Sequence, residues 1–568
     1  MHAPRGMSLI DVVIGTALVL IIFLALFGIL RASILLSAYV KSEATATSIA
    51  NNQVEYIRSL PYDSVGTLGG IPAGLIAQNA TTTEDGVGYN VRTFIDYYDS
   101  PSDGTGAGDT NGITTDYKRI KVTVFYTAGG KPRQFILVSN YAPLGIETTA
   151  GGGTLQINVV NAAGTPLAGA SVTITNASTA PTVNLTTFSD STGTVYLPGA
   201  ATSTQYAVSV TKTGYSTAQT YVRDSNNQNP TPGYLTVVKN QTTSSTFAID
   251  ALGSMNVMTF SPIATSTFSD SFANASKLTS LTSTVASGGA LSLSGGVGNY
   301  AASGSAISTT SAPAYLIMWG VASSTQSVPA GTTVSFHIVD GTGTLLPDSV
   351  LAGNAAGFIS TVNLYGISTT TYPALALSAS LSTTATSTTP SITNWGLSYQ
   401  SGPTPLPNVS FTLTGKKTIG STGGGAPIYK TTVNATTSAT GTNLLTLEWD
   451  LYSLSVPSYD IIDACTVPPY ALAPAAAVNE SLILSTHSTN ALLVSVADSL
   501  GDVVSGVSVT LSRPGYSKVV TSSACGAAYF GSLSAASDYS ITITKSGYTT
   551  NTVSGVSVTG QTFYADSF

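Results

Sequence analysis

The two cysteines, Cys465 and Cys525, are the residues best suited to covalent chemistry in this chain. In an oxidising compartment beyond a membrane they could form one disulfide. The alternative is a pair of buried thiols, and their separation in the sequence leaves both interpretations open. Zinc is not expected, because His337 and His487 lack ligand-like spacing to either cysteine.

Carboxylates gather in one glycine-rich stretch that contains Asp99, Asp103 and Asp109. Calcium takes several oxygen ligands, which such loops supply, although the spacing here is not that of an EF-hand. Asp, Ser and Gly are also the residues of an ordinary solvated turn. A calcium site and a plain loop are therefore both kept as expectations.

Catalytic machinery is not evident in the sequence. No G-x-S-x-G, H-E-x-x-H, Walker A or Rossmann pattern occurs in a supporting context. Three histidines leave few general bases near neutral pH. A glycosidase needs only two carboxylates, which sequence spacing does not exclude. We nevertheless expect no enzymatic activity and no organic cofactor.

Asp11 stands directly before an apolar run from Val12 to Leu30. Nineteen helical residues at about 1.5 Å each span roughly 28 Å, close to the hydrocarbon thickness of a bilayer. A carboxylate beside such a run is costly in lipid, so it indicates a functional role. The sequence predicts a transmembrane helix segment over residues 7–30.

The leader His2–Gly6 contains one basic residue, Arg5, and Asp11 lies five residues past Gly6. This pattern resembles the class III signal of type IV prepilins and pseudopilins. The resemblance implies that a prepilin peptidase removes residues 1–6 by cutting between Gly6 and Met7, and that Met7 is then N-methylated. It also implies that Asp11 pairs with the N-terminus of a neighbouring pilin subunit during filament assembly, in the position where the family usually has glutamate.

Two other interpretations of the N-terminus compete with this one. A secretory signal has a 7–15 residue apolar core followed by a small-residue cleavage site. Here the run is longer, and no A-x-A site follows Leu30. A plain membrane anchor fits the hydropathy equally well but leaves Gly6 and Asp11 unexplained.

Composition sets limits on the rest of the chain. Its 568 residues suggest about four domains. Charged residues make up 8%, against about 25% in typical soluble domains, while hydrophobic residues make up 43%. This combination favours short strands and uncharged polar loops, as in β-rich surface proteins. The net charge of −7 argues against nucleic acid as the main partner.

One long helix is expected over residues 7–60, because proline is absent until Pro61. Strand-like segments at 89–95, 119–126 and 134–138 predict a small antiparallel sheet within 86–142, with a hairpin turn at 128–132. Helix and sheet together, residues 7–147, resemble a pilin head, and the segments Ser59–Asp63 and Thr115–Arg119 resemble those of PilV-type minor pilins. The expected apolar stripe that would pack the helix on the sheet consists of Ile34, Leu35, Ala38, Ile49 and Ile57.

A linker at 148–153 precedes a repeated pattern. Tyr206–Tyr215 is echoed by Tyr539–Tyr548, and a weaker copy includes Tyr452–Tyr459. In each copy apolar residues alternate, which is typical of a strand with one buried face. The copies at 154–250 and 490–568, and the divergent one at 405–485, resemble carboxypeptidase regulatory-like domains, which are β-sandwiches related to Cna-B modules. The resemblance implies non-catalytic spacer modules.

The remaining segment, 255–402, is expected to form a larger β-sandwich or jelly roll. Such folds often bind carbohydrate, and Trp319, Tyr365 and Trp395 could stack on sugars. Trp395 and Leu397 alternate like residues of a core face, however, so burial is the favoured interpretation.

The predicted fold class is thus multidomain: a long N-terminal helix with a small antiparallel sheet, followed by several all-β sandwiches. The predicted function is a minor pilin of a type IV pilus that presents β-sandwich modules for adhesion. The subunit would be a single-pass protein of the cytoplasmic membrane before assembly, in contact with lipid, and would then lie at the cell surface. The alternatives are a membrane-anchored surface binding protein that does not polymerise, and a secretion-system pseudopilin.

Overall fold

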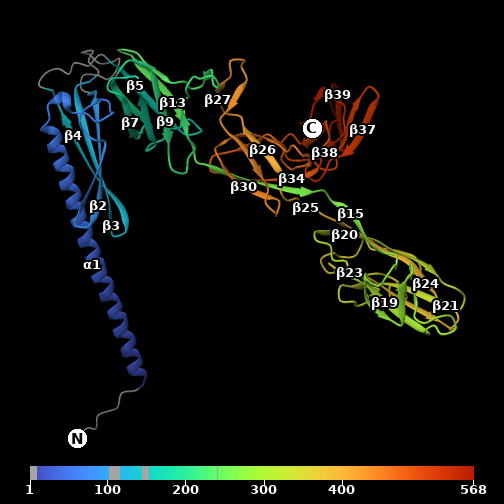
Figure 1. The fold of residues 1–568 in the computed structure, drawn as a ribbon. Helices are drawn as coiled ribbons and strands as arrows, with labels where there is room; N and C mark the ends of the chain where they lie inside the picture. The colour runs from blue at the N-terminus through green and yellow to red at the C-terminus, as the bar shows by residue number, and fades with distance from the viewer. Residues whose placement is uncertain (1–8, 101–114, 144–151, 240, 568) are drawn as a thin grey trace, which may run out of the picture.

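The computed structural model describes residues 9–100, 115–143, 152–239 and 241–567. One long helix, α1 (Leu9–Arg58), is followed by a series of β-sheets (Figure 1). This confirms the predicted fold class, a helix with a small sheet followed by all-β modules.

The first sheet lies on the second half of α1 and forms with it a unit that we call the head. Its antiparallel strands follow the order β1 (Asn79–Glu84), β2 (Val87–Tyr98), β3 (Tyr117–Ala128) and β4 (Lys131–Tyr141). The predicted hairpin turn falls between β3 and β4, where Gly129 and Gly130 take the positive φ angles of a two-residue turn. A short 3-10 helix, η1 (Tyr62–Ser64), follows α1.

The face of α1 that meets this sheet matches the predicted one only in part. The residues buried between helix and sheet are Ala46, Ala50, Val54 and Ile57. Of the predicted stripe, Ile57 is buried and Ile49 packs against the same core, whereas Ile34 and Leu35 are exposed. Alanine has little area to bury, but it lets a helix approach a sheet closely. A search for large apolar side chains therefore misses the alanines that pack this helix on the sheet.

Residues 153–248 form a two-layer sandwich, which we call sandwich 1. One sheet has the order β13-β5-β8, and the other has the order β10-β9-β6-β7, with β12 also paired to β9. Strands β5 and β13 run parallel, while the other pairs are antiparallel. The strands are β5 (Gly153–Val160), β6 (Ser171–Asn176), β7 (Val183–Phe188), β8 (Thr194–Ala200), β9 (Ser203–Thr211), β10 (Ala218–Gln219), β12 (Leu235–Val237) and β13 (Thr242–Ala248).

The C-terminal sandwich, residues 491–567, repeats this topology except that it has no strand corresponding to β12. Its sheets are β38-β35-β41 and β37-β36-β39-β40, and its first and last strands, β35 and β41, again run parallel. The sequence echo between the two segments therefore reflects a shared strand plan. The strands are β35 (Ala491–Ala497), β36 (Ser508–Arg513), β37 (Tyr516–Thr521), β38 (Ala527–Phe530), β39 (Ala536–Thr544), β40 (Asn551–Val558) and β41 (Gln561–Ser567).

A third copy, the middle sandwich, is split in the sequence. Its first strand, β14 (Gly253–Ser261), runs parallel to its last strand, β34 (Ala477–Thr486), and antiparallel to β30 (Thr442–Leu447). Met255 and Val257 are buried in the same core as Phe411 and Leu482. The remaining strands are β25 (Thr404–Pro405), β26 (Ser410–Gly415), β29 (Thr432–Thr436), β31 (Asp450–Ser455), β32 (Tyr459–Asp463) and β33 (Tyr470–Leu472).

This arrangement corrects two predicted boundaries. Residues 255–261, expected to open a separate domain at 255–402, belong to the sandwich that was expected to begin at 405. The larger sandwich, residues 264–401, is therefore an insertion between the first and second strands of the middle sandwich. In the other two copies the same connection begins with short turns, at Asn161–Thr165 and Asp498–Asp502.

The inserted domain, here called the insert, has two facing sheets. Their orders are β17-β18-β24-β20-β22, with β15 also paired to β24, and β16-β19-β23-β21. Figure 1 shows the insert projecting from the other domains beyond β25 and β15. Its strands are β15 (Ala264–Asp270), β16 (Leu278–Thr282), β17 (Thr284–Ser287), β18 (Ala290–Leu293), β19 (Ser303–Ser308), β20 (Leu316–Ser327), β21 (Thr332–Asp340), β22 (Thr361–Asn363), β23 (Leu375–Thr383) and β24 (Ser391–Ser401).

Several acidic residues of the β portion serve as turn formers. The carboxylate of Asp190 accepts hydrogen bonds from the backbone N–H groups of Thr192 and Thr194, at 2.8 and 2.9 Å. Asp340 and Asp498 make the same contacts with the residues two and four positions later. Each of these turns has a glycine at the fourth position with positive φ. These carboxylates thus stabilise tight turns.

Candidate functional site

The first half of α1 is an apolar helix that the rest of the described chain does not cover. Among the described residues, one helix segment, Thr16–Arg58, is long and apolar enough to cross a membrane. Its most apolar window has a mean hydropathy of 2.7, and none of that window is buried. Asp11 lies within α1, whereas Gly6 and Met7 lie outside the described residues. The predicted cleavage, methylation and assembly roles of these residues remain predictions.

Apolar exposure continues past the charged residue that follows the membrane run. Beyond Arg31, the side chains of Ile34 and Leu36 are each 61% exposed. The head reaches the helix at Leu35, beside the β3–β4 turn at Gly129, then at Tyr39, where the Arg133 guanidinium lies 5.0 Å from the ring, and at the Lys41–Asp85 ion pair of 3.1 Å. We call residues 32–38 the stalk. At about 1.5 Å per residue it is about 10 Å long, and it is apolar on surfaces that the head leaves open.

The head and sandwich 1 are docked through specific contacts. The Arg92 guanidinium lies 4.3 Å from the centre of the Phe188 ring. The Gln78 side-chain amide donates to the carbonyl of Asn184 at 2.7 Å. Ile71 of the head is buried in the hydrophobic core of sandwich 1. The helix therefore leads into the β modules through a packed junction.

The predicted calcium loop falls largely outside the described residues. Asp103 and Asp109 are not among them. Asp99 follows β2 and is buried, and Asp116 accepts a hydrogen bond from the N–H of Ser100 at 2.6 Å. Within the described part of the chain, no group of three or more His, Cys, Asp or Glu side chains is placed to hold a metal. The calcium site stays a prediction.

The tryptophans of the insert form its core. Trp319 and Trp395 are fully buried, and the Trp319 indole N–H donates to the Tyr372 carbonyl at 2.9 Å. Trp395 packs against Phe272, with ring centres 5.1 Å apart. The favoured interpretation, burial, is confirmed for both, and neither is available to stack on a sugar. Tyr365 is different, because 54% of it is exposed.

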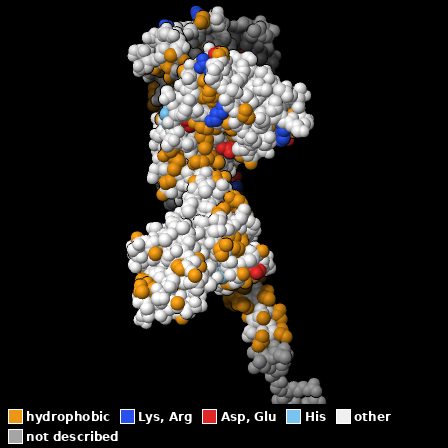
Figure 2. All heavy atoms as spheres, turned by 90° about the vertical axis from the view of Figure 1, so that its right-hand side faces the viewer, with side chains coloured by type: hydrophobic (Ala, Val, Ile, Leu, Met, Phe, Trp, Pro, Cys, Tyr) orange, Lys and Arg blue, Asp and Glu red, His pale blue; other side chains and the backbone are white. Residues whose placement is uncertain are grey.

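The insert has very few charged groups. Between residues 264 and 401 the acidic and basic side chains are Asp270, Lys277, Asp340 and Asp348. Each of them makes a hydrogen bond to the backbone of the insert itself. The face of the insert seen in Figure 2 is accordingly almost free of red and blue side chains. Any recognition by this domain must rely on hydroxyl, amide and apolar contacts.

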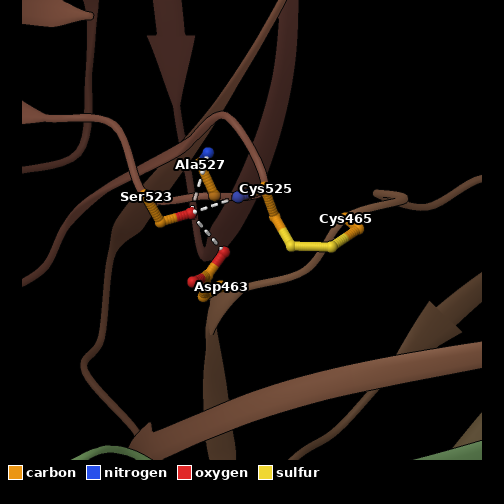
Figure 3. Close-up of a disulfide and its surroundings, with 5 residues drawn as sticks. All are labelled: Asp463, Cys465, Ser523, Cys525 and Ala527. Carbon is orange, nitrogen blue, oxygen red and sulfur yellow. Dashed lines mark hydrogen bonds between the residues drawn. A yellow bond between two sulfur atoms is a disulfide. The ribbon is translucent and has the colours of Figure 1, made fainter. Parts of the chain in front are cut away.

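A disulfide joins Cys465 of the middle sandwich to Cys525 of the C-terminal sandwich (Figure 3). Beside it, the Ser523 hydroxyl donates to the Asp463 carboxylate at 2.7 Å and accepts from the N–H of Cys525 at 3.1 Å. The structure therefore supports the disulfide rather than two separate thiols. The bond links domains that are adjacent in the sequence.

The same interface contains a buried carboxylate that the sequence analysis missed. The Asp460 side chain has no exposed surface, and it accepts hydrogen bonds from the Tyr529 hydroxyl at 2.6 Å and from Ser488 N–H at 2.9 Å. His487 Nδ1 lies 2.9 Å from its other oxygen. Burial alone would raise the pKa of Asp460, but these hydrogen bonds outweigh it and lower the pKa. The sequence does contain one feature that could have pointed to this site, because Asp460 is a single acid inside the otherwise apolar segment Tyr459–Ile462.

The two sandwiches also share apolar packing at this interface. Leu493 and Ala527 of the C-terminal sandwich are buried in the core of the middle sandwich. The Gln561 amide donates to the Ile461 carbonyl at 2.9 Å. The disulfide, the buried Asp460 and this shared core together make the middle and C-terminal sandwiches one unit.

Two further acids are buried in the middle sandwich. Glu448 pairs with Lys417 at 3.3 Å and Lys430 at 2.7 Å, and Lys430 also donates to the Thr217 carbonyl of sandwich 1. Strands β11 (Asn229–Pro230), β27 (Thr418–Ser421) and β28 (Pro427–Tyr429) form a small sheet across the same junction. Glu480, on β34, is 6% exposed, and burial raises its pKa to about 7.

No protein-family model matches the chain, and no curated protein matches it. Among solved structures, the Bacillus anthracis TIE protein is similar at 10% identity and a TM-score of 0.16, covering 86% of this chain and 72% of that one. The major pilin BcpA of Bacillus cereus is similar at 9% identity and a TM-score of 0.14, covering 73% and 99%.

The full-length major pilin SpaD from Corynebacterium diphtheriae is similar at 12% identity and a TM-score of 0.13, covering 74% of this chain and 98% of that chain. At such TM-scores these similarities carry no argument about the function of this chain. Its architecture rests on its own helix and sheets, and its function must be argued from the apolar helix and the domains that the helix carries.

Proposed function

We propose that the protein is a minor pilin-like subunit of a type IV filament, anchored by α1 and displaying the insert for contact with a surface. The motif of Gly6, Met7 and Asp11 ahead of the apolar run supports this proposal. So does the uncovered first half of α1, which suits a helix that moves from a bilayer into a bundle of similar helices.

The stalk is the observation that carries the proposal. Ile34 and Leu36 are exposed and lie beyond the predicted membrane run of residues 7–30, so a simple anchor spanning that run would leave them in water. Burial of apolar surface yields about 25 cal/mol per Å², and exposed contiguous apolar surface usually marks an interface. Helices of neighbouring subunits would cover the stalk in a filament core. Within a single copy, no other part of the described chain covers the Ile34 and Leu36 side chains.

Display by the β portion fits the same scheme. The insert is attached only through the short segments around Ser261 and Thr404, whose backbones pair with each other. Its outward projection (Figure 1) and its nearly uncharged surface suit adhesion through hydroxyl and amide contacts. The ligand class that fits is an uncharged, hydrogen-bonding surface, such as a neutral polysaccharide.

The test is the N-terminal mass of the mature protein made with and without a prepilin peptidase. We expect a peptidase-dependent new terminus at Met7, carrying a methyl group. Asp11→Ala should then block filament assembly while leaving membrane insertion intact. Asp63→Ala, at an exposed position, is the control and should leave both filament assembly and membrane insertion unchanged. An intact Met1 with normal surface display would instead identify a membrane-anchored protein that does not polymerise.

A further inference from the structure

The chain reaches the insert from the membrane helix along one covalent route. It passes from the head through sandwich 1, then along β14, and enters the insert at Ala264. Residues 404–567 follow the insert, so most of the middle sandwich and all of the C-terminal sandwich lie off this route. Along this covalent route, tension between an anchored helix and a bound insert passes through two β elements outside the head and the insert itself, in parallel with the β11-β27-β28 sheet that joins sandwich 1 to the middle sandwich.

The first of these elements is the parallel pair β5 and β13. Its register runs from Thr154 opposite Thr242 to Val160 opposite Ala248, which makes seven residue pairs. The chain enters β5 at Gly153 and leaves β13 at Ala248, at opposite ends of the pair. A pull on these two points slides the strands along each other. All the hydrogen bonds of the pair are loaded together, rather than one after another as in unzipping.

The second element is β14 itself. The load enters at Gly253 and leaves at Ser261, the two ends of one strand. A strand already rises about 3.3 Å per residue, so it has almost no further length to release. It is held on both sides, by six residue pairs with β30 and seven with β34. The middle sandwich thus surrounds a taut strand without being stretched by it.

We propose that this chain is built as a tension-bearing tether, in which sandwich 1 is a shear-loaded clamp and β14 is an inextensible link to the insert. The source of the load rests on the proposed function, since it requires an anchored helix and an insert that binds a surface. The clamp itself is a property of the strand register. The middle and C-terminal sandwiches, bonded through Cys465 and Cys525, brace the link from the side.

Single-molecule force spectroscopy on the full-length protein in nanodiscs tests this proposal. Handles are attached at cysteines introduced as Asn140→Cys, at the end of β4, and Ile263→Cys, which is exposed beside the insert. The native pair Cys465–Cys525 is already bonded and does not react. Release of sandwich 1, residues 153–248, should add about 300 Å of chain at up to about 3.5 Å per residue.

The matched control loads the same pair from one end. Ala163 follows β5 and is exposed, so handles at Ala163→Cys and Ile263→Cys pull both strands from their C-terminal ends and unzip them. None of these substitutions lies in β5 or β13. We expect the unfolding force at equal loading rate to be at least twofold higher in the first geometry than in the second.

Equal forces in the two geometries, or a higher force in the unzipping geometry, would overturn the clamp. A length gain well above about 300 Å in the first geometry would show that sandwich 1 is not the only element between the handles that yields. Both results are independent of filament assembly. A chain that fails to assemble but shows the twofold difference would count against the pilin proposal alone.

Discussion

The side-chain amide of Asn256 donates a hydrogen bond to the side-chain oxygen of Asn479 at 3.1 Å, although 223 residues separate them. The two asparagines lie side by side on the parallel strands β14 and β34. Their contact shows that the middle sandwich is complete only when its first strand, which precedes the insert, is counted. The insert is therefore a domain placed within a domain.

Excision of the insert should leave the middle sandwich folded. Ser261 and Thr404 are paired on antiparallel segments, so an Asn-Gly turn in place of residues 262–403 can close the gap. We expect the shortened protein to be soluble and to melt cooperatively, and residues 264–401 expressed alone to melt separately. Circular dichroism and calorimetry measure both. An unfolded middle sandwich would show that the insert is needed for its stability.

The sequence predicts the classes of element well and the domain boundary poorly, for a physical reason. Alternation of apolar residues, as at Tyr539, Ile541 and Ile543, depends on neighbours two positions apart, so it survives in a single sequence. The pairing of β14 with β34 depends on residues more than 200 positions away, and no local pattern records it. Likewise, the residues that seat α1 on its sheet include Ala46 and Ala50, which have no distinctive pattern of size.

The candidate functional sites likewise include features that a local sequence motif shows and features that only the fold brings together. Asp11 and its apolar run are a local motif, so the sequence alone suggests the hypothesis. The interface around Asp460 joins residues from β32, β38 and the segment between β34 and β35, which only the fold brings together. The cysteines were found in the sequence, but their partnership needed the structure.

Loss of the disulfide should destabilise the two C-terminal modules. The bond closes a loop with a sequence separation of 60, for which chain entropy predicts about 4 kcal/mol of stabilisation as an upper estimate. We expect Cys465→Ser with Cys525→Ser to lower the denaturation midpoint, measured by tryptophan fluorescence. Reducing agent should lower the midpoint of the native protein to the same value and leave the double variant unchanged. A native protein insensitive to reduction under these conditions would contradict the assignment.

Acid should weaken the interface around Asp460. The folded pKa of this group is lowered, so it contributes stability above the unfolded pKa of about 3.9, and the contribution is lost as pH falls through the folded pKa. Asp460→Asn should lower the free energy of unfolding by about 1–3 kcal/mol at pH 7, because an amide cannot accept all the hydrogen bonds that the buried carboxylate accepts. The free energy of unfolding of the Asp460→Asn variant should also fall less steeply below pH 4 than that of the native protein. Asp63→Asn is the exposed control, and an equal acid slope in both variants would refute the role.

The ionisation of Glu480 should affect stability in the opposite direction from that of Asp460, because it should destabilise the protein at high pH. Burial raises its folded pKa to about 7, so the neutral carboxyl is tolerated at low pH, and stability is lost as pH rises from the unfolded pKa of about 4.3 to the folded pKa of about 7. Glu480→Gln should remove this loss and stabilise the protein at pH 9 by up to about 3 kcal/mol, with little effect at pH 4. Thermal melts across this range measure the effect. Glu84→Gln, on the exposed strand β1, should leave the pH profile unchanged.

Variants in the stalk should distinguish filament assembly from membrane anchoring. Ile34→Ser with Leu36→Ser removes apolar surface that is exposed beyond the predicted membrane run, so membrane insertion should be unchanged. Because helices of neighbouring subunits would bury these side chains, we expect at least a tenfold loss of protein in sheared filaments, measured by immunoblot. Leu75→Ser, at an exposed apolar position on the head, is the matched control. Normal assembly of the double variant, alongside a block by Asp11→Ala, would mean that the stalk is not part of the filament core.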